Sequence, residues 1–337
     1  MGAPRGVADA ALGRALAYNA RFTTGGSGRG MSGEGNSPAE DQWSQWLLHR
    51  RHGDDTQFQQ IMRAAVDRYV ERLLDGAQLR AGQTLVDVGT GEGVVALRAI
   101  ERVGSTLRVL LTDVSEPMLR HAETQALERG VRDQCTFLRC PADRLDDIAD
   151  ASVDVVVTRS VLAYVADKTA ALREFHRILK PGGRISLAEP VFMDEALAAS
   201  AIRMVIESKP PEGVSPFMTL LHRWKAAQYP DTEEKIRSSP IVNYSERDVI
   251  QFAKSAGFPA VHLELHIDTF PSVVRSWDVF INSSPHPLAP PLAAIMAEHF
   301  TAEERQLFER SMRPLVEDPK GISTDRMLYL TANKPLG

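Results

Sequence analysis

Short apolar runs alternate along the middle of the chain with stretches that have the spacing of amphipathic helices. Apolar residues recur at intervals of three and four where helices are expected, as Val94, Leu97 and Ile100 do. Runs that are apolar at nearly every position indicate strands buried on both faces of a sheet. The pattern therefore predicts an α/β fold. Its strands are expected within residues 85–88, 107–115, 135–145, 152–167, 171–190, 260–270 and 325–334.

The same pattern divides the chain into parts around a central core. Residues 24–38 are rich in glycine and serine, which indicates a flexible tether. Proline-punctuated and then helical sequence separates the last two predicted strands by more than usual for an antiparallel pair. The predicted parts are a flexible leader (1–40), N-terminal helices (41–80), a cofactor-binding core (81–190), a helical lid insertion (191–240) and the C-terminal part of the sheet (241–337), with a helical insertion at about 271–323.

Three glycines separate the first predicted strand from the helix after it. Gly89, Gly91 and Gly93 have no Cβ and can adopt positive φ, so a ligand can lie against main-chain amides near the helix N-terminus. A dinucleotide fingerprint requires a further glycine where this chain has Val94, and no Gly-Lys-Ser/Thr of a phosphate-binding loop follows. We therefore expect a nucleotide-like cofactor other than a dinucleotide.

The string Asp87-Val88-Gly89-Thr90-Gly91-Glu92-Gly93 resembles the first motif of class I S-adenosylmethionine-dependent methyltransferases. The helix, Pro-Gly-Gly turn and strand within residues 171–190 are similar to the segment after the fourth strand in that family, and the likeness covers about residues 80–190. It implies an α/β fold with a seven-stranded Rossmann-like methyltransferase sheet, a helical N-terminal extension and helical insertions. The implied cofactor is S-adenosyl-L-methionine. Small-molecule enzymes of quinone biosynthesis and secondary metabolism have the most similar motifs.

The resemblance also implies which residues hold the cofactor. The glycine loop carries the methionine end, and Asp87 reaches toward the cofactor's amino group. Asp113 follows the second strand and can accept both ribose hydroxyls, although an acid there can also cap the next helix, as Ser115 could. In the family, residues at the positions of Val114 and Met118 flank the adenine; the alternative for Met118 is a place in the core.

Two further positions complete this predicted set. An acid at the position of Asp143 accepts from the adenine amino group in the family, while the amide before it touches a ring nitrogen. Arg159 ends the fourth strand, where ligands of open α/β sheets bind. The predicted cofactor-binding residues are Asp87, Gly89, Thr90, Gly91, Asp113, Val114, Met118, Ala142, Asp143 and Arg159.

Two residues are candidates for removing a proton from the acceptor. Glu189 lies at the end of the fifth strand, and His222 lies in the predicted helical stretch at 215–230; histidine has a pKa near working pH and is therefore suited to this role. A surface or packing role is the alternative for His222. Many members of the family rely on alignment of the nucleophile alone and use no side-chain base.

Composition narrows the partners. The 337 residues are 43% hydrophobic and carry a net charge of −5, so a large core is available and no basic face for nucleic acid is expected. The two cysteines, Cys135 and Cys140, favour core thiols over a disulfide or metal pair. We expect no metal, no membrane segment, a cytoplasmic location and a possible homodimer.

The segments outside the core leave alternatives open. The N-terminal helices either cover the cofactor or pack on the flank of the sheet, and Arg50, Arg51 and His52 either meet an acidic substrate or form a solvated turn. The C-terminal insertion either completes the pocket or makes a dimer contact. Its Trp277, Phe280 and His286 are candidate substrate contacts, with structural roles favoured.

The sequence therefore predicts transfer of a methyl group to an oxygen, nitrogen or carbon of a small, partly apolar metabolite, in secondary metabolism. One alternative is a non-methylating use of the same fold, as a cyclase or a regulatory subunit. Another is a nicotinamide-dependent oxidoreductase, against which Val94 and the Pro181-Gly182-Gly183 turn count.

Overall fold

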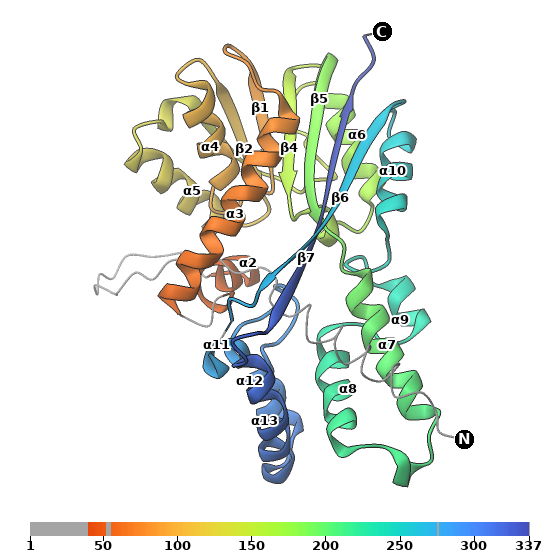
Figure 1. The fold of residues 1–337 in the computed structure, drawn as a ribbon. Coiled ribbons are helices and arrows are strands. Elements are labelled where there is room, and N and C mark those ends of the chain that lie inside the picture. The colour runs from red at the N-terminus through yellow and green to blue at the C-terminus, as the bar shows by residue number, and fades with distance from the viewer. Residues whose placement is uncertain (1–39, 52–54, 275, 337) are drawn as a thin grey trace.

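A computed structural model describes residues 40–51, 55–274 and 276–336. Within them the chain folds into one seven-stranded sheet with helices on both faces (Figure 1), which confirms the predicted α/β fold with a Rossmann-like sheet. The predicted leader lies outside the described residues except for Glu40. The strands are β1 (Thr84–Val88), β2 (Arg108–Asp113), β3 (Cys135–Arg139), β4 (Val153–Arg159), β5 (Leu179–Pro190), β6 (Val261–Pro271) and β7 (Ile322–Asn333).

The spatial order of the strands is β3-β2-β1-β4-β5-β7-β6. The first five pair in parallel, and β7 pairs antiparallel with both β5 and β6. The chain order reverses between β1 and β4, so their carboxyl ends leave a crevice in which ligands of such sheets bind. The predicted Pro-Gly-Gly turn lies inside β5, where the register with β4 shifts between Val153 and Val155.

Two apolar cores lie on the two faces of this sheet. Successive residues of β1 show why: Leu85 packs on one face and Val86 on the other, because side chains alternate along a strand. Helices α3 (Thr56–Ala77), α4 (Val94–Val103) and α5 (Glu116–Glu128) cover the first face, and α6 (Lys168–Ile178) and α10 (Glu246–Ser255) cover the second. Cys135 and Cys140 are buried and free, as expected of core thiols.

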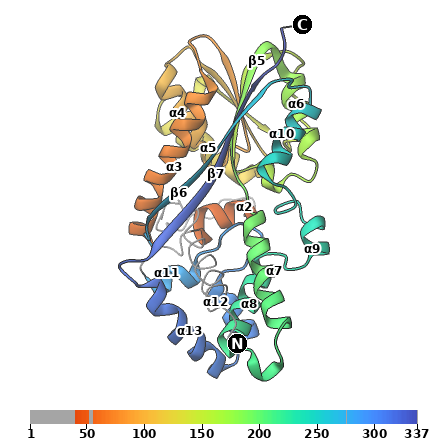
Figure 2. The same cartoon turned by 45° about the vertical axis from the view of Figure 1, so that its right-hand side comes forward.

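The insertions form a helical lobe with a core of its own. It joins Trp224, Trp277 and Phe308, among others, and β6 and β7 extend from the sheet to reach it (Figure 2). Its helices are α7 (Met193–Glu207), α8 (Pro216–Gln228), α11 (Trp277–Asn282), α12 (Leu292–His299) and α13 (Ala302–Val316), with α9 (Glu233–Ser238) beside α7. Short helical turns are η2 (Arg132–Gln134), η3 (Leu162–Tyr164) and η4 (Pro211–Gly213).

One buried ion pair ties the first two helices of this lobe together. Lys225 Nζ of α8 lies 3.1 Å from Glu195 Oε2 of α7, and the two side chains are 0% and 2% exposed.

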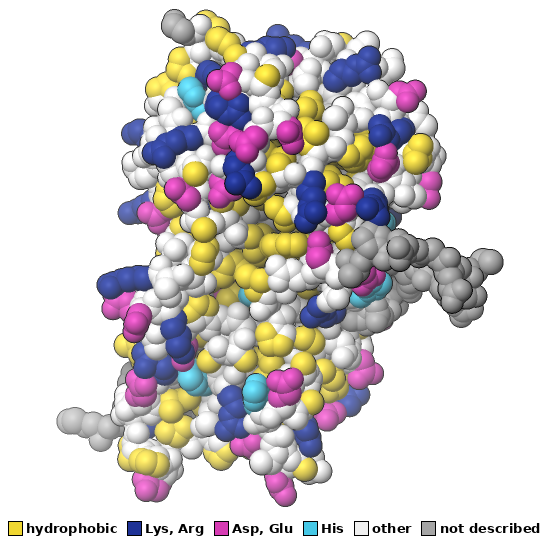
Figure 3. All heavy atoms as spheres, turned by 180° about the vertical axis from the view of Figure 1, so that it is seen from behind, with side chains coloured by type: hydrophobic (Ala, Val, Ile, Leu, Met, Phe, Trp, Pro, Cys, Tyr) yellow, Lys and Arg dark blue, Asp and Glu magenta, His cyan; other side chains and the backbone are white. Residues whose placement is uncertain are grey.

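On the face in Figure 3, hydrophobic side chains gather across the middle of the molecule, while charged side chains cluster above and below them.

Candidate active site

A cavity of about 280 Å³ opens at the carboxyl ends of β1, β2 and β4. Three sources build its wall: the strand ends and loops at the carboxyl ends of β1 to β5, a short N-terminal helical segment, and a loop of the C-terminal insertion. Its residues are Trp43, Trp46, Leu47, Arg51, Gly89, Thr90, Gly91, Glu92, Asp113, Val114, Cys140, Pro141, Ala142, Asp143, Arg159, Ser160, Val161, Tyr164, Val165, Ala166, Pro190, Phe192 and Pro285. Eight of the ten predicted cofactor residues are among them; Asp87 and Met118 are not.

The glycine loop forms the floor of the cavity. Gly89 and Gly91 have φ of +65° and +53°, which side chains with a Cβ rarely adopt. A Cβ on Gly89 would lie 2.3 Å from Val161 Cγ2, whereas the nearest described atom to one on Gly91 is Leu47 Cδ1, at 3.6 Å. Gly89 is therefore required by packing within the protein, and Gly91 by its backbone and by the space above it.

Asp87 acts within the loop. Its Oδ2 accepts a hydrogen bond of 2.7 Å from Thr90 Oγ1 and one of 3.1 Å from the Ala96 N–H. The side chain is buried, and burial raises the pKa of its carboxyl to about 7. The aspartate thus joins the strand end to the start of α4. Its predicted reach toward the cofactor stays a prediction.

Asp113 is placed to meet a ligand. Its Oδ2 accepts from the Gly91 N–H at 2.9 Å and its Oδ1 from the Ser115 N–H at 2.9 Å, and the residue lines the cavity. Burial raises the pKa of this carboxyl. The alternative role as helix cap belongs instead to Ser115, whose hydroxyl accepts from the Met118 N–H.

The predicted adenine walls differ in their exposure. Val114 is 42% exposed and lines the cavity, whereas Met118 is fully buried in α5 beneath it. The environment of Met118 is thus the one expected if the residue belongs to the core. Ala142 and Asp143 also line the cavity, from the loop after β3.

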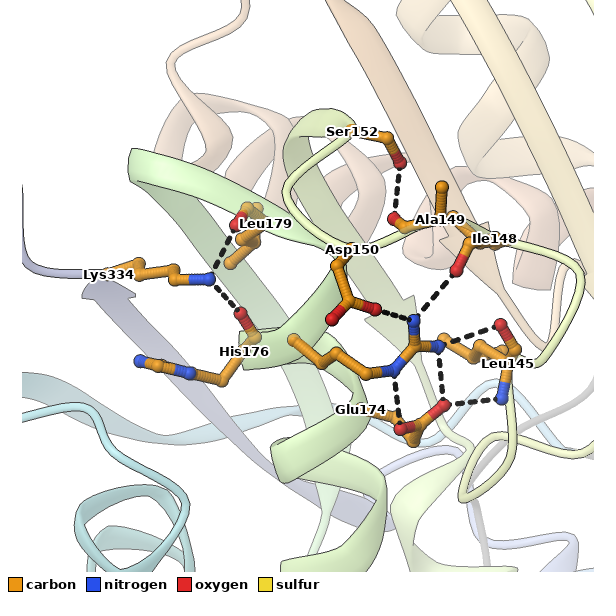
Figure 4. Close-up of polar contacts among 10 residues, drawn as sticks. Leu145, Ile148, Ala149, Asp150, Ser152, Glu174, His176, Leu179 and Lys334 are labelled. Carbon is orange, nitrogen blue, oxygen red and sulfur yellow. Dashed lines mark hydrogen bonds and ion pairs between the residues drawn. The ribbon is translucent and has the colours of Figure 1, made fainter.

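An arginine of α6 holds the end of that loop. Arg177 donates to the carbonyls of Leu145 and Ile148, each at 2.9 Å, and pairs with Asp150 and Glu174 (Figure 4). Glu174 in turn accepts from the Leu145 N–H at 2.8 Å. These contacts raise the pKa of the arginine and lower that of Glu174. The loop with Ala142 and Asp143 is therefore anchored from outside the cavity.

The end of β4 is strained and polar. Ser160 has φ of +58°, in the left-handed region that a residue with a Cβ seldom adopts. Its N–H donates to the Ala188 carbonyl at 2.9 Å, which holds this conformation. Arg159, Ser160 and Tyr164 all line the cavity, as predicted from their place after the fourth strand.

Glu189, a candidate base, has its oxygens engaged by the main chain. They accept hydrogen bonds from the N–H groups of Val161 and Leu162 at 2.9 to 3.1 Å. The side chain is fully buried, which raises the pKa of the carboxyl to about 7. Glu189 is not among the cavity-lining residues, so these contacts give it a positioning role, and its catalytic role stays a prediction.

His222, the other candidate base, lies in the helical lobe. Its Nε2 is 3.0 Å from Asp231 Oδ2, and Lys235 Nζ is 2.8 Å from the other oxygen of the same carboxylate. The cluster ties α8 to α9. The structure does not bring His222 to the cavity described above, and a base role for it stays a prediction.

The roof of the cavity comes from the N-terminal segment, α2 (Gln42–Gln45) with the π-helical turn η1 (Trp46–Arg50). Trp43 meets Tyr164 edge to face at 5.1 Å between ring centroids, and Trp46 Nε1 donates to the Ser284 carbonyl at 3.2 Å. The sequence leaves open whether the N-terminal helices cover the cofactor or pack on the flank of the sheet. The structure shows both arrangements, because α2 and η1 cover the cavity while α3 packs on the sheet. Pro285 shows that the C-terminal insertion completes the wall.

Arg51 corrects one interpretation of the sequence. A solvated turn is the favoured expectation for Arg50, Arg51 and His52, yet Arg51 is only 2% exposed and its guanidinium stacks over Trp46 at 4.9 Å. The charged run gives no signal of this burial, because such runs are typical of exposed turns and neighbouring Arg50 is indeed exposed. His52 lies outside the described residues. Glu92 also lines the cavity and was not anticipated as a site residue.

The aromatic candidates of the insertion have mainly structural surroundings. Trp277 and Phe280 stack at 5.8 Å and belong to the core of the lobe. His286 is buried against Phe192 and Tyr229, with Nε2 3.2 Å from the Gln228 carbonyl, and burial lowers its pKa to about 4. Of the residues that face His286, Phe192 is the one that reaches the cavity.

These residues fit an adenosine-type cofactor with a charged amino-acid end. A cavity-lining carboxylate, Asp113, is available for hydroxyl donors, and a Cβ-free surface at Gly91 allows close approach of a ligand to the main chain. Exposed Val114 offers an apolar surface for a flat ring. Within the described ranges, no cluster of three or more His, Cys, Asp or Glu side chains is arranged to hold a metal ion.

The same described ranges contain no helix that is both long and apolar enough to span a membrane.

A family model described as a methyltransferase domain matches residues 79–228. Nocamycin O-methyltransferase of Saccharothrix syringae is 37% identical over 153 residues, which are 43% of this chain and 52% of that protein. The chain therefore spans about half of that relative's length.

Two further comparisons extend over more of the molecule. The ubiquinone/menaquinone biosynthesis C-methyltransferase of Xylella fastidiosa strain M23 is 30% identical over 182 residues, 54% of this chain and 68% of that enzyme. The crystal structure of the YcgJ protein from Bacillus subtilis shares the fold, with a TM-score of 0.50, 15% identity and coverage of 80% of this chain and 100% of its own. The chain belongs to the S-adenosylmethionine-dependent methyltransferases, and S-adenosylmethionine is its cofactor.

Proposed function

We propose that the protein transfers a methyl group to an oxygen, nitrogen or carbon of a small, partly apolar metabolite, in secondary metabolism. The observation that carries the proposal is a single cavity that joins eight predicted cofactor residues to an apolar wall of Trp43, Trp46 and Phe192. The names of the two relatives support leaving the acceptor atom open, since one is an O-methyltransferase and the other a C-methyltransferase.

The cofactor would be held along the strand ends. Asp113 would accept the ribose hydroxyls, and the surface at Gly91 would carry the amino-acid end. Val114, Ala142 and Asp143 would enclose the adenine. Bound there, S-adenosylmethionine supplies an electrophilic methyl group on a sulfonium.

The protein's contribution is then alignment and exclusion of water. The acceptor would lie between the strand ends and the roof formed by Trp43 and Trp46, where apolar side chains keep water from the reacting atoms. Tyr164, in η3 after β4, carries a phenolic hydroxyl and lines the same cavity. Burial raises the pKa of its phenol, which keeps it a neutral hydrogen-bond donor near neutral pH.

The proposal also includes the reaction's setting. A net charge of −5 supports a free metabolite as the acceptor in preference to nucleic acid. We place the reaction in the cytoplasm, and a homodimer stays a prediction.

Calorimetric titration tests the proposal. The purified protein is titrated with S-adenosylmethionine, S-adenosylhomocysteine and oxidised nicotinamide dinucleotides, and metabolites are then screened for a mass gain of one methyl group. Binding of the first two ligands alone, followed by methylation of a metabolite, is expected. Cofactor binding without methylation of any acceptor would favour the cyclase or regulatory alternative, and binding of dinucleotides alone would overturn the assignment.

A further inference from the structure

Two arginines meet in the cavity with hydrogen-bonding capacity left unused. Arg159 comes from the end of β4 and Arg51 from just after η1, and both line the cavity. Nε and Nη1 of Arg159 and Nε of Arg51 are buried and have no hydrogen-bond partner among the described residues. Buried polar groups of proteins are nearly always paired, so two cavity-lining arginines with N–H groups left unpaired indicate a ligand that accepts hydrogen bonds from their guanidinium groups.

The protein's own acids do not satisfy these guanidinium groups. Glu92 shares the cavity and its charge raises the pKa of both arginines, but no ion pair or hydrogen bond joins it to Arg51 or Arg159 within the part of the chain that the structure describes. Asp87 and Glu189, whose charges also act on Arg159, are engaged by loop N–H groups. Burial and the mutual repulsion of the two cations lower the pKa of Arg51 to about 10. An added anion would relieve that repulsion.

The surroundings of Arg51 indicate what else the ligand contains. The same segment that carries Arg51 supplies Trp43, Trp46 and Leu47 to the cavity, so the positive charge is flanked by aromatic and aliphatic surface. The predicted cofactor contacts lie instead on the strand-end loops, with Asp113 and Asp143 as their acids. The part of the cavity formed by Arg51 and these apolar side chains therefore fits a molecule with an acid group and an apolar body.

We propose that Arg51 and Arg159 together bind the carboxylate of the acceptor substrate, whose apolar body lies against Trp43 and Trp46. The proposal rests on the proposed function and names its substrate class, an apolar acid. Planar guanidinium groups match a carboxylate because each can donate two parallel hydrogen bonds to it. Arg159, which the sequence assigns to the cofactor, is then a specificity residue shared by the two halves of the cavity.

The test uses binding as its readout. Protein saturated with S-adenosylhomocysteine is titrated with aryl and alkyl carboxylates, such as 3-phenylpropionate, and with the matching amides, while tryptophan fluorescence and heat are recorded. Carboxylates are expected to bind at least about tenfold more tightly than their amides. Arg51→Gln and Arg159→Gln are expected to remove that preference. Arg50→Gln, a neighbour that is exposed and bonded to Gln45, is the matched control.

A second comparison separates the two carboxylates that could occupy the site. The affinities of Arg51→Gln for S-adenosylhomocysteine and for 5′-methylthioadenosine, which lacks the amino-acid end, are measured. We expect neither to change. A loss confined to S-adenosylhomocysteine would show that the arginines hold the cofactor's own carboxylate, and would overturn the proposal.

The remaining outcomes are equally clear. Equal binding of acids and amides, or binding of neither by a protein that binds S-adenosylhomocysteine, overturns the substrate class while leaving methyl transfer intact. Failure of the wild-type protein to bind S-adenosylhomocysteine would instead count against the proposed function. Should Arg51→Gln melt abnormally, Arg51→Lys, which keeps the charge but loses the planar fork, is expected to retain part of the preference for acids.

Discussion

The N–H of Val161 donates to the carboxylate of Glu189, at 2.9 Å to one oxygen and 3.1 Å to the other. The bond joins the end of β5 to the loop after β4, and the Leu162 N–H adds a third contact at 3.1 Å. The same loop carries Ser160 and Tyr164 into the cavity. A buried acid at a strand end is thus used here to shape the loop that faces the ligand.

Replacing Glu189 with Gln should therefore lower stability. The amide keeps one accepting oxygen but turns an NH₂ group toward backbone donors, and a lost hydrogen bond to a buried N–H costs about 1–3 kcal/mol. We expect the free energy of unfolding, measured in urea, to fall by that amount. Asp143→Asn, in the exposed part of the cavity wall, is the control and should leave the unfolding free energy unchanged. Loss of turnover in Glu189→Gln at unchanged stability would favour the catalytic role instead.

The glycine loop allows a comparison among three alanine variants. Gly82, Gly89 and Gly91 all have positive φ, but a Cβ at Gly82 would meet no atom of the described residues within 4 Å. Gly82→Ala should therefore report the backbone cost alone, roughly 1–2 kcal/mol. Gly91→Ala should cost about the same in stability but weaken cofactor binding. Gly89→Ala should cost clearly more, because its Cβ would meet Val161 at 2.3 Å.

The hydrogen bond between Glu189 and Val161 strengthens the prediction for Gly89. Val161 cannot easily move away from a new Cβ at residue 89, since Glu189 holds its N–H and its β-branched side chain has few rotamers. Chemical unfolding gives the stability of each variant, and calorimetry gives its affinity for S-adenosylhomocysteine. Equal stability of Gly82→Ala and Gly89→Ala would contradict the packing role assigned to Gly89.

The ion pair between Glu195 and Lys225 should behave as a buried pair. Removing one partner takes the opposite charge away from a buried ion, and such changes cost about 3–5 kcal/mol. Glu195→Gln and Lys225→Met should each lower the unfolding free energy accordingly, while the Glu195→Leu/Lys225→Met double variant should recover most of the loss. Equal destabilisation by the single and double variants would mean that the pair is not coupled. The exposed pair Arg313 and Glu309 on α13 serves as control.

The sequence predicts the sheet well because its strands have a strong periodic signal. Leu85 and Val86 must both be buried, on opposite faces, and only a sheet covered twice accommodates such a run. The glycine loop can be predicted from the sequence as well, because positive φ restricts which residues can occupy its positions. Eight predicted cofactor residues accordingly line one cavity.

The roof could not be predicted in the same way. Arg51 follows an exposed arginine in a charged run, and its burial depends on where η1 packs, which involves Ser284 more than 200 residues away. Likewise, Asp87 turns into the loop because Thr90 and Ala96 offer it donors. Local pattern identifies the candidates, whereas long-range packing decides which of them face the ligand.

His286 provides a test of how the insertion is held against the cavity wall. It is 3% exposed, packs on Phe192 and Tyr229, and its Nδ1 has no hydrogen-bond partner in the part of the chain that the structure describes. Because burial lowers its pKa from 6.5 to about 4, the unfolded chain binds this proton more readily than the folded one. The stability contributed by the neutral ring is therefore fully present above pH 6.5 and is lost as the pH falls through 4.

Comparison of the wild-type protein with His286→Gln isolates this contribution. The variant has no titrating group at residue 286, so its unfolding free energy should fall less between pH 7 and pH 4, by up to about 3 kcal/mol. His299→Gln, which removes a histidine exposed on α12, is the control and should follow the wild type. Urea unfolding at closely spaced pH values gives the difference. Parallel curves for the wild type and His286→Gln would show that the ring is not held neutral, and that the wall formed with Phe192 admits water.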